Sequence, residues 1–105
     1  MKIKINISNM QDLINVYASD EEDKQLIVNG KIIETDVDEF ITQVLFITNS
    51  WNPVYSGFGI DGESFNLLFE NNGKKREING KNSLPTNYHK LKNLVRRFLK
   101  WWNQQ

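Results

Sequence analysis

A chain of 105 residues with 39% hydrophobic and 25% charged residues has the length and composition of one globular domain, so we expect residues 1–105 to form a single domain. Its three Trp, three Tyr and six Phe exclude a disordered chain, and the absence of cysteine excludes a disulfide scaffold, thiolate zinc and a thiol nucleophile. Basic and acidic residues number 13 each and cancel, whereas dedicated nucleic-acid-binding domains tend to be basic.

The first segment is predicted to be a strand with one buried face, because Ile3, Ile5 and Ile7 alternate with polar residues. Such alternation differs from the continuous apolar run of a signal peptide. No segment reaches the ~20 apolar residues that cross a bilayer. We therefore expect a cytoplasmic protein with no membrane partner.

A short helix is predicted to follow this strand. Ser8 has the position of an N-cap, and Gln11 completes a capping box. Met10, Leu13, Ile14 and Tyr17 would share one side of a helix that runs to about Ala18. The acidic residues 20–23 would then form a solvated loop.

A hairpin and a second helix come next. Asn29-Gly30 separates the apolar segments 25–28 and 31–34, and this dipeptide favours a type I′ turn. Asp36 and Glu39 mark the start of the helix. Its apolar stripe consists of Val37, Phe40, Val44, Ile47 and Trp51, with Ile41 beside it. Phe46 points away from the stripe, so either a second layer covers it or it is exposed.

The remainder is predicted to form three strands and a last helix. The strands cover residues 54–60, 64–70 and 74–78, with turns at Asp61-Gly62 and Asn72-Gly73, and Asn79-Gly80 ends the third. Pro85 suits the first turn of a helix. The apolar face of that helix comprises Tyr88, Leu91, Leu94, Val95, Phe98, Leu99 and Trp102.

The predicted order is therefore β-α-ββ-α-βββ-α, an α+β fold. Because tight glycine turns join neighbouring strands, the sheet is expected to be mainly antiparallel. Its face would be covered by the amphipathic helices.

The sequence contains no recognisable catalytic or metal-binding signature. His89, the single histidine, falls on the polar side of the last helix without an acid near it in sequence, and we interpret it as exposed and inert. The carboxylates at residues 20–23, 36–39, 61 and 63 lie where loops, helix starts and turns favour them. Gly57, Gly59 and Gly62 match a phosphate-binding pattern only superficially, because no helix start follows. We expect no enzyme, no cofactor and no metal site.

The charge is unevenly distributed along the chain. Residues 1–73 hold four lysines against twelve acids, whereas residues 74–105 hold nine lysines and arginines against the single acid Glu77. Either the two parts pack together and neutralise each other, or the basic part attracts a partner. The candidate partner-binding residues are Lys74, Lys75, Arg76, Lys90, Arg96, Arg97, Lys100, Trp101 and Phe46. Trp51 and Tyr55 could add to a binding surface or plug the end of the core.

From Trp51 to Val95 the sequence resembles a group of small uncharacterised bacterial proteins. The resemblance rests on Trp51-x-x-x-Tyr55, Asp61-Gly62-x-x-Phe65-x-Leu67, Asn72-Gly73-Lys74-Lys75 and Gly80-x-Asn82-x-x-Pro85-x-Asn87-Tyr88-x-x-Leu91. Ser83-Leu84 departs from the pattern, in which a small residue and an aromatic residue are usual. The resemblance implies a bacterial cytoplasmic α+β domain and no particular activity.

Three hypotheses of function follow. The first is a non-enzymatic protein that binds a protein partner, as inhibitors, immunity proteins and accessory proteins do. The second is nucleic-acid binding through residues 74–101, where cations would meet phosphates and an aromatic ring would stack on a base. The third is a small hydrolase or metal enzyme, for which the sequence offers the least support.

Overall fold

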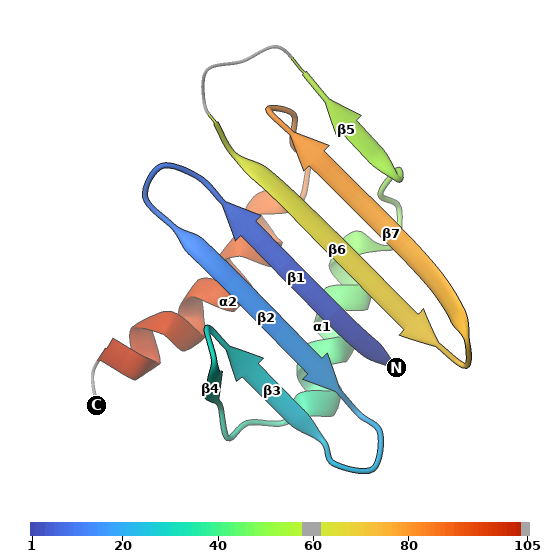
Figure 1. The fold of residues 1–105 in the computed structure, drawn as a ribbon, viewed down its shortest axis with the longest axis vertical. Coiled ribbons are helices and arrows are strands. Elements are labelled where there is room, and N and C mark those ends of the chain that lie inside the picture. Colours follow the sequence, from blue (N-terminus) through green and yellow to red (C-terminus); the bar gives the residue numbers. More distant parts are fainter. Residues whose placement is uncertain (58–61, 104–105) are drawn as a thin grey trace.

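The protein folds into one sheet with two helices on one side (Figure 1). The computed structural model describes residues 1–57 and 62–103, and for residues 100–103 it describes the helical backbone alone. Within these ranges seven strands form a single sheet in the order β4-β3-β2-β1-β6-β7-β5. The strands are β1 Lys2–Ser8, β2 Leu13–Ser19, β3 Gln25–Val28, β4 Lys31–Ile32, β5 Val54–Ser56, β6 Ser64–Asn71 and β7 Lys74–Lys81.

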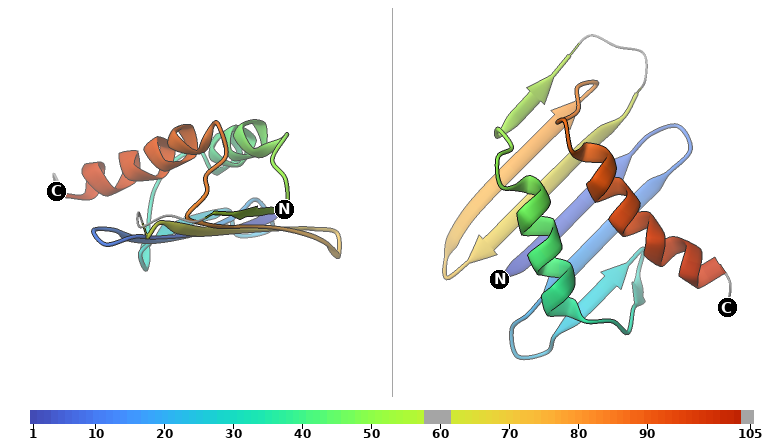
Figure 2. Two further views of the ribbon diagram at one scale, coloured as in Figure 1. Left: turned by 90° about the horizontal axis from the view of Figure 1, so that it is seen from above. Right: turned by 180° about the vertical axis from the view of Figure 1, so that it is seen from behind.

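Both helices, α1 (Val37–Thr48) and α2 (Tyr88–Asn103), cover the same face of the sheet (Figure 2). The core lies between the helices and this face, and Ile3, Ile5 and Ile7 are fully buried in it. The α+β class and the mainly antiparallel sheet are thus confirmed. No helix among the described residues combines the length and apolar character of a membrane crossing.

The start of α1 is formed by a side-chain cap, as the sequence predicts. Asp36 has an extended backbone, and its Oδ1 accepts a hydrogen bond of 3.0 Å from the backbone N–H of Glu39. Val37, Phe40, Ile41 and Val44 then face the core, while Ile47 is half-buried. The cap satisfies a backbone donor that the first helical turn leaves unpaired.

Replacing Asp36 with alanine is expected to lower the free energy of unfolding by about 1 kcal/mol, because the capping bond is lost. The matched control is Glu34→Ala, which removes an equally charged, exposed side chain two residues before the cap. Urea unfolding followed by circular dichroism measures both variants. Equal stability of the two would contradict a capping role for Asp36.

The helix predicted between Ser8 and Ala18 is wrong, because this segment forms the turn after β1 and then β2. Asn9 makes the turn: its Oδ1 accepts from the backbone N–H groups of Gln11 and Asp12. In β2 the side chains of Ile14, Val16 and Ala18 are buried at every second position, whereas Met10 and Leu13 are 92% and 66% exposed. β2 pairs with β1 on one side and β3 on the other, and these pairings decide in favour of a strand.

Two of the three Asn-Gly pairs form the turns that the sequence predicts. Asn29-Gly30 and Asn72-Gly73 have positive φ at both residues, as a type I′ turn requires. The third prediction is wrong: β7 runs through Asn79 and Gly80 to Lys81. Gly80 lies in this strand because the ring of Phe65, directly opposite on β6, occupies the space of its missing side chain.

The predicted turn at Asp61-Gly62 does not join neighbouring strands. β5 pairs with β7 at the edge of the sheet, in parallel, and β7 therefore lies between β5 and β6. The strand predicted over 54–60 is observed as Val54–Ser56, and residues 58–61 lie outside the described part of the chain. Sequence alone could not give this order, because β5 pairs with a strand that does not follow it directly in the chain.

No helix covers the second face of the sheet (Figure 2), which carries polar and charged side chains together with Leu13, Tyr17, Ile27 and Leu68. Across four neighbouring strands it bears a row of asparagines in register: Asn15, Asn6, Asn66 and Asn79. The Asn66 amide donates to Glu77 Oε2 at 2.9 Å and to Asn79 Oδ1. An antiparallel sheet tolerates such a solvated face.

Candidate functional site

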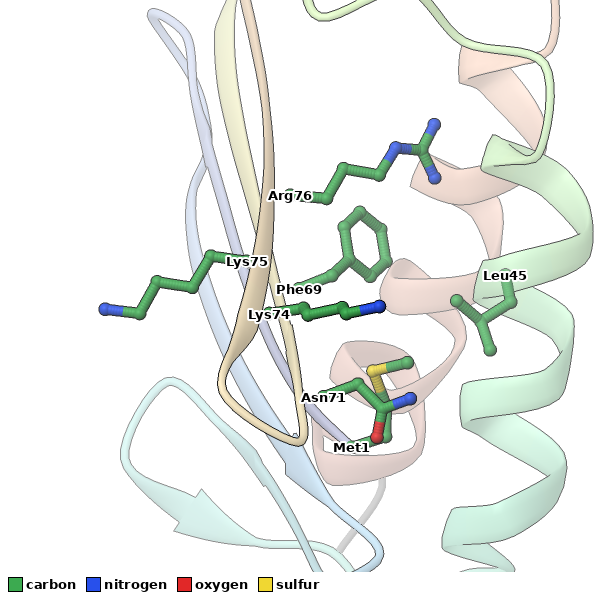
Figure 3. Close-up of a pocket in the computed structure, with 7 residues that line it drawn as sticks. All are labelled: Met1, Leu45, Phe69, Asn71, Lys74, Lys75 and Arg76. Carbon is green, nitrogen blue, oxygen red and sulfur yellow. The ribbon is translucent and has the colours of Figure 1, made fainter.

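The basic C-terminal segment is spread over several surfaces. On β7, Lys74 and Arg76 point to the side of the helices, and Lys75 points to the opposite side (Figure 3). Lys90 and Arg97 are exposed on α2, whereas Arg96 forms an ion pair with Asp12. The side chains of Lys100 and Trp101 lie outside the described part of the structure.

A pocket of about 280 Å3 lies between α1 and the β6–β7 hairpin (Figure 3). Its lining residues are Met1, Leu45, Phe69, Asn71, Lys74, Lys75 and Arg76. Met1, Leu45 and Phe69 supply apolar walls, and Lys74 and Arg76 direct their charged groups to this side of the sheet, whereas the side chain of Lys75 points to the other side (Figure 3). None of the lining residues is an acid. The pocket therefore combines apolar surface with positive charge.

Arg76 is held in place at the rim of this pocket. Its Nη2 donates to the backbone carbonyls of Thr48 and Trp51, at 3.0 and 3.3 Å, where α1 ends. A positive charge at a helix C-terminus interacts favourably with the helix dipole. The guanidinium carbon also lies 5.4 Å from the centre of the Phe69 ring. Arg76 is thus pre-positioned, with further N–H donors that these two bonds do not use.

Phe46 is exposed on the outer side of α1, which resolves the question left by its position in the helix. Its side chain is 83% exposed, and it follows Leu45, a wall of the pocket, in α1. Trp51, by contrast, is buried, with its ring 5.9 Å from that of Phe65 and 6.4 Å from that of Tyr88. Trp51 therefore plugs the end of the core.

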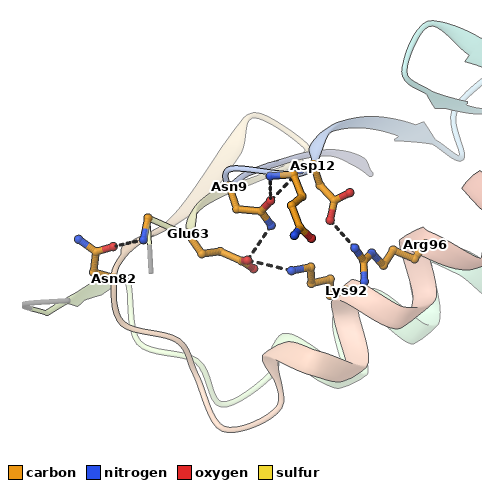
Figure 4. A network of polar contacts seen from close by, with 8 residues as sticks. Asn9, Asp12, Glu63, Asn82, Lys92 and Arg96 are labelled. Carbon is orange, nitrogen blue, oxygen red and sulfur yellow. Dashed lines mark hydrogen bonds and ion pairs between the residues drawn. The ribbon is translucent and has the colours of Figure 1, made fainter. Parts of the chain in front are cut away.

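A second polar cluster joins the two oppositely charged parts of the chain (Figure 4). Glu63 Oε1 accepts hydrogen bonds from Asn9 Nδ2 and Lys92 Nζ, both at 2.8 Å. Next to it, Arg96 on α2 pairs with Asp12 in the β1–β2 turn. Part of the charge asymmetry is thus neutralised within the fold.

The sequence predicts Glu63 to be an ordinary turn residue, whereas the structure makes it the centre of this polar cluster. Glu63 is only 9% exposed, although it follows the predicted turn directly. Its partners lie 54 and 29 residues away in sequence, so no local pattern announces them. The lone His89, in contrast, is exposed as expected.

The environment of Glu63 keeps it charged. Burial alone raises the pKa of its carboxyl group, but the hydrogen bonds and the charge of Lys92 outweigh burial, and the pKa lies below its ordinary value. The Tyr88 hydroxyl lies beside this carboxylate, and burial together with the negative charge raises its pKa. Tyr88 OH and Glu63 Oε2 are both buried and make no hydrogen bond with the described residues. The negative charge of Glu63 is thus balanced by Lys92, next to the Tyr88 hydroxyl. This cluster anchors α2 to the β1–β2 turn and to the segment before β6.

In residues 1–57 and 62–103, no three His, Asp or Glu side chains are arranged to hold a metal ion. Comparison with known proteins produced no match, whether to family models, to curated proteins or to solved structures.

Proposed function

We propose that this chain is a non-enzymatic cytoplasmic protein that binds a protein partner, as small inhibitors, immunity proteins and accessory proteins do. The contact region would be the α1–hairpin surface, which consists of Leu45, Phe46, Lys74 and Arg76 and lies over the buried ring of Phe69. The observation that carries the proposal is the apolar pocket with a cationic rim, together with Phe46, which is exposed on the helix that supplies the pocket wall Leu45.

Single exposed apolar residues are common on proteins and need no explanation. Phe46 differs because the residue before it in α1, Leu45, lines a pocket that an inserted side chain can fill. Aromatic and arginine side chains around such a pocket are the usual centres of binding energy in protein interfaces. Phe46 and Arg76 supply both types.

The arrangement of cations favours a protein partner over nucleic acid. A nucleic-acid groove follows the phosphate backbone with aligned cations and open aromatic rings. Here Lys75 lies on the opposite face of the sheet from Lys74, and Arg96 is already paired with Asp12. Phe69 is buried, at 4% exposure, so its ring offers no platform for a base.

Replacing Phe46 with aspartate is expected to abolish partner binding, because it removes an apolar contact worth about 2 kcal/mol and introduces a charge that the interface would have to desolvate. The affinity loss should exceed about 30-fold. To test this, the chain is immobilised and incubated with an extract of the source organism, and the retained proteins are identified. The recovered partner is then purified, and its binding to the wild type and to the variant is measured by calorimetry.

The matched control is Met10→Asp, because Met10 is 92% exposed in the β1–β2 turn, at the other end of the sheet from the β6–β7 turn (Figure 1). This variant should bind the partner as the wild type does. Recovery of no stoichiometric protein, or equal binding by the Phe46→Asp variant, would refute the proposal. Binding that disappears on nuclease treatment would instead establish nucleic-acid recognition.

A further inference from the structure

We infer that the pocket between α1 and the β6–β7 hairpin receives an apolar side chain that is flanked by carboxylates, in an acidic segment of the partner. This inference rests on the proposed function and specifies the chemistry of the partner. It depends on three features of the pocket: its size, its apolar walls and the charges at its rim.

The pocket is large enough to receive a side chain from a partner segment. Its volume is about 280 Å3, close to the lower end of the range of about 300–1,000 Å3 that small-molecule pockets have, and it opens to the surface. An aliphatic side chain that projects from a partner segment can therefore enter it.

The walls require that side chain to be apolar. Leu45 from α1, Met1 at the start of the sheet and Phe69 from β6 form apolar walls of the pocket (Figure 3). Each buried CH2 group of the entering side chain would contribute about 0.8 kcal/mol. A polar group that reaches past the rim to these walls would lose its hydration there without a hydrogen-bond partner.

The rim requires negative charge next to the apolar group. The Lys74 ammonium lies on one side of Phe69 and the Arg76 guanidinium on the other (Figure 3). Lys74 forms no ion pair with a described residue, and none of the lining residues is acidic. Arg76 is fixed by Thr48 and Trp51, so it can bind a carboxylate without losing further side-chain freedom.

The hairpin provides an internal control for the role of Lys74. Lys75 is its neighbour in sequence and carries the same charge, yet its side chain points away from Phe69 and Leu45, to the other face of the sheet (Figure 3). Both residues are exposed at the end of the hairpin, so neither substitution should affect folding. Lys74→Gln and Lys75→Gln therefore remove the same charge on opposite sides of the sheet.

The experiment titrates the 15N-labelled full chain with three blocked peptides and follows amide chemical shifts. The first peptide is Gly-Asp-Leu-Asp-Gly, the second replaces both aspartates with asparagine, and the third replaces leucine with glycine. We expect saturable shifts at Leu45, Phe69 and Lys74 with the first peptide alone. Lys74→Gln should weaken this binding about fivefold, Lys75→Gln less than twofold, and added salt should weaken it further.

Three results would overturn the inference: no saturable shift at the pocket with the acidic peptide, equal binding of the asparagine peptide, or equal weakening by the two lysine substitutions. The proposed function is tested separately from the inference. If Phe46→Asp abolishes capture of the partner but the acidic peptide does not bind, the partner covers α1 without entering the pocket, and only the inference fails. If the peptide binds but no partner is recovered, the pocket chemistry is supported and the proposed function fails.

Discussion

Replacing Gly80 with alanine is expected to lower the free energy of unfolding by about 2–3 kcal/mol, through overpacking of the core. A Cβ at this position would lie 2.0 Å from Cε1 of Phe65 and 2.5 Å from Cζ, far inside contact distance. The Phe65 ring cannot move aside easily, because ring centres of Tyr88, Trp51 and Tyr55 lie 5.0, 5.9 and 6.3 Å from its own. Thermal unfolding should show a fall in Tm of about 10 °C.

A double-mutant cycle tests whether the clash with Phe65 is the cause. In a Phe65→Leu background the smaller side chain leaves room for the new methyl group, so Gly80→Ala should cost at least 1 kcal/mol less there. The exposed neighbour Lys81 provides a control, since Lys81→Ala should change stability by no more than about 0.5 kcal/mol. An equal cost of Gly80→Ala in both backgrounds would show that the ring does not impose the glycine.

Replacing Lys92 with methionine is expected to lower the free energy of unfolding at pH 7 by about 3 kcal/mol, because it leaves a buried carboxylate without its counter-charge. The side chains of Lys92 and Glu63 are 20% and 12% exposed, so water replaces the lost partner poorly. Methionine preserves most of the length and apolar surface of lysine, which confines the change to the charge. Urea unfolding at pH 7 measures the effect.

The pH dependence of this effect has a definite sign. In the wild type the pKa of Glu63 lies below its ordinary value of 4.5, so its stabilising contribution is complete above that pH and is lost as the pH falls below it. In the Lys92→Met variant the unpaired carboxylate is costly only while it is charged. The stability difference between wild type and variant should therefore shrink between pH 7 and pH 4.

The double variant Glu63→Gln with Lys92→Met removes both charges and serves as the control. It should be more stable at pH 7 than Lys92→Met alone, since no unpaired charge remains buried. A stability difference that is the same at pH 7 and pH 4, or a double variant no more stable than the single one, would refute the assignment of Glu63 and Lys92 as a stabilising pair.

The directions of the cations on β7 could have been predicted from the sequence. Successive residues of a strand point to opposite faces, so a strand at 74–78 already places Lys74 and Arg76 on one face and Lys75 on the other. The list of candidate partner-binding residues does not make this distinction between Lys74, Lys75 and Arg76. No such reasoning leads to Leu45 as the opposite wall of the pocket, because the position of α1 over the hairpin depends on the packing of the whole core.

The segment at 10–18 shows where local pattern is ambiguous. Met10, Leu13, Ile14 and Tyr17 satisfy a helical period, while Ile14, Val16 and Ala18 satisfy the period of a strand. Helix formation offers hydrogen bonds within the segment itself, whereas a strand needs neighbours. The neighbours exist, in β1 and β3, but only the assembled sheet supplies them.

Several features of this protein depend on contacts between near neighbours and follow from the sequence: the strand at Ile3 to Ile7, the capped start of α1, the two Asn-Gly turns and the apolar face of α2. Backbone sterics, capping and periodicity act over a few residues, and they can be read from the order of the side chains. Other features appear in the folded chain alone: the parallel edge strand β5, the glycine beneath Phe65, the Glu63–Lys92 pair and the pocket between α1 and the β6–β7 hairpin. Each of these joins segments that are distant in the chain, and their meeting follows from the packing of the whole sheet against two helices.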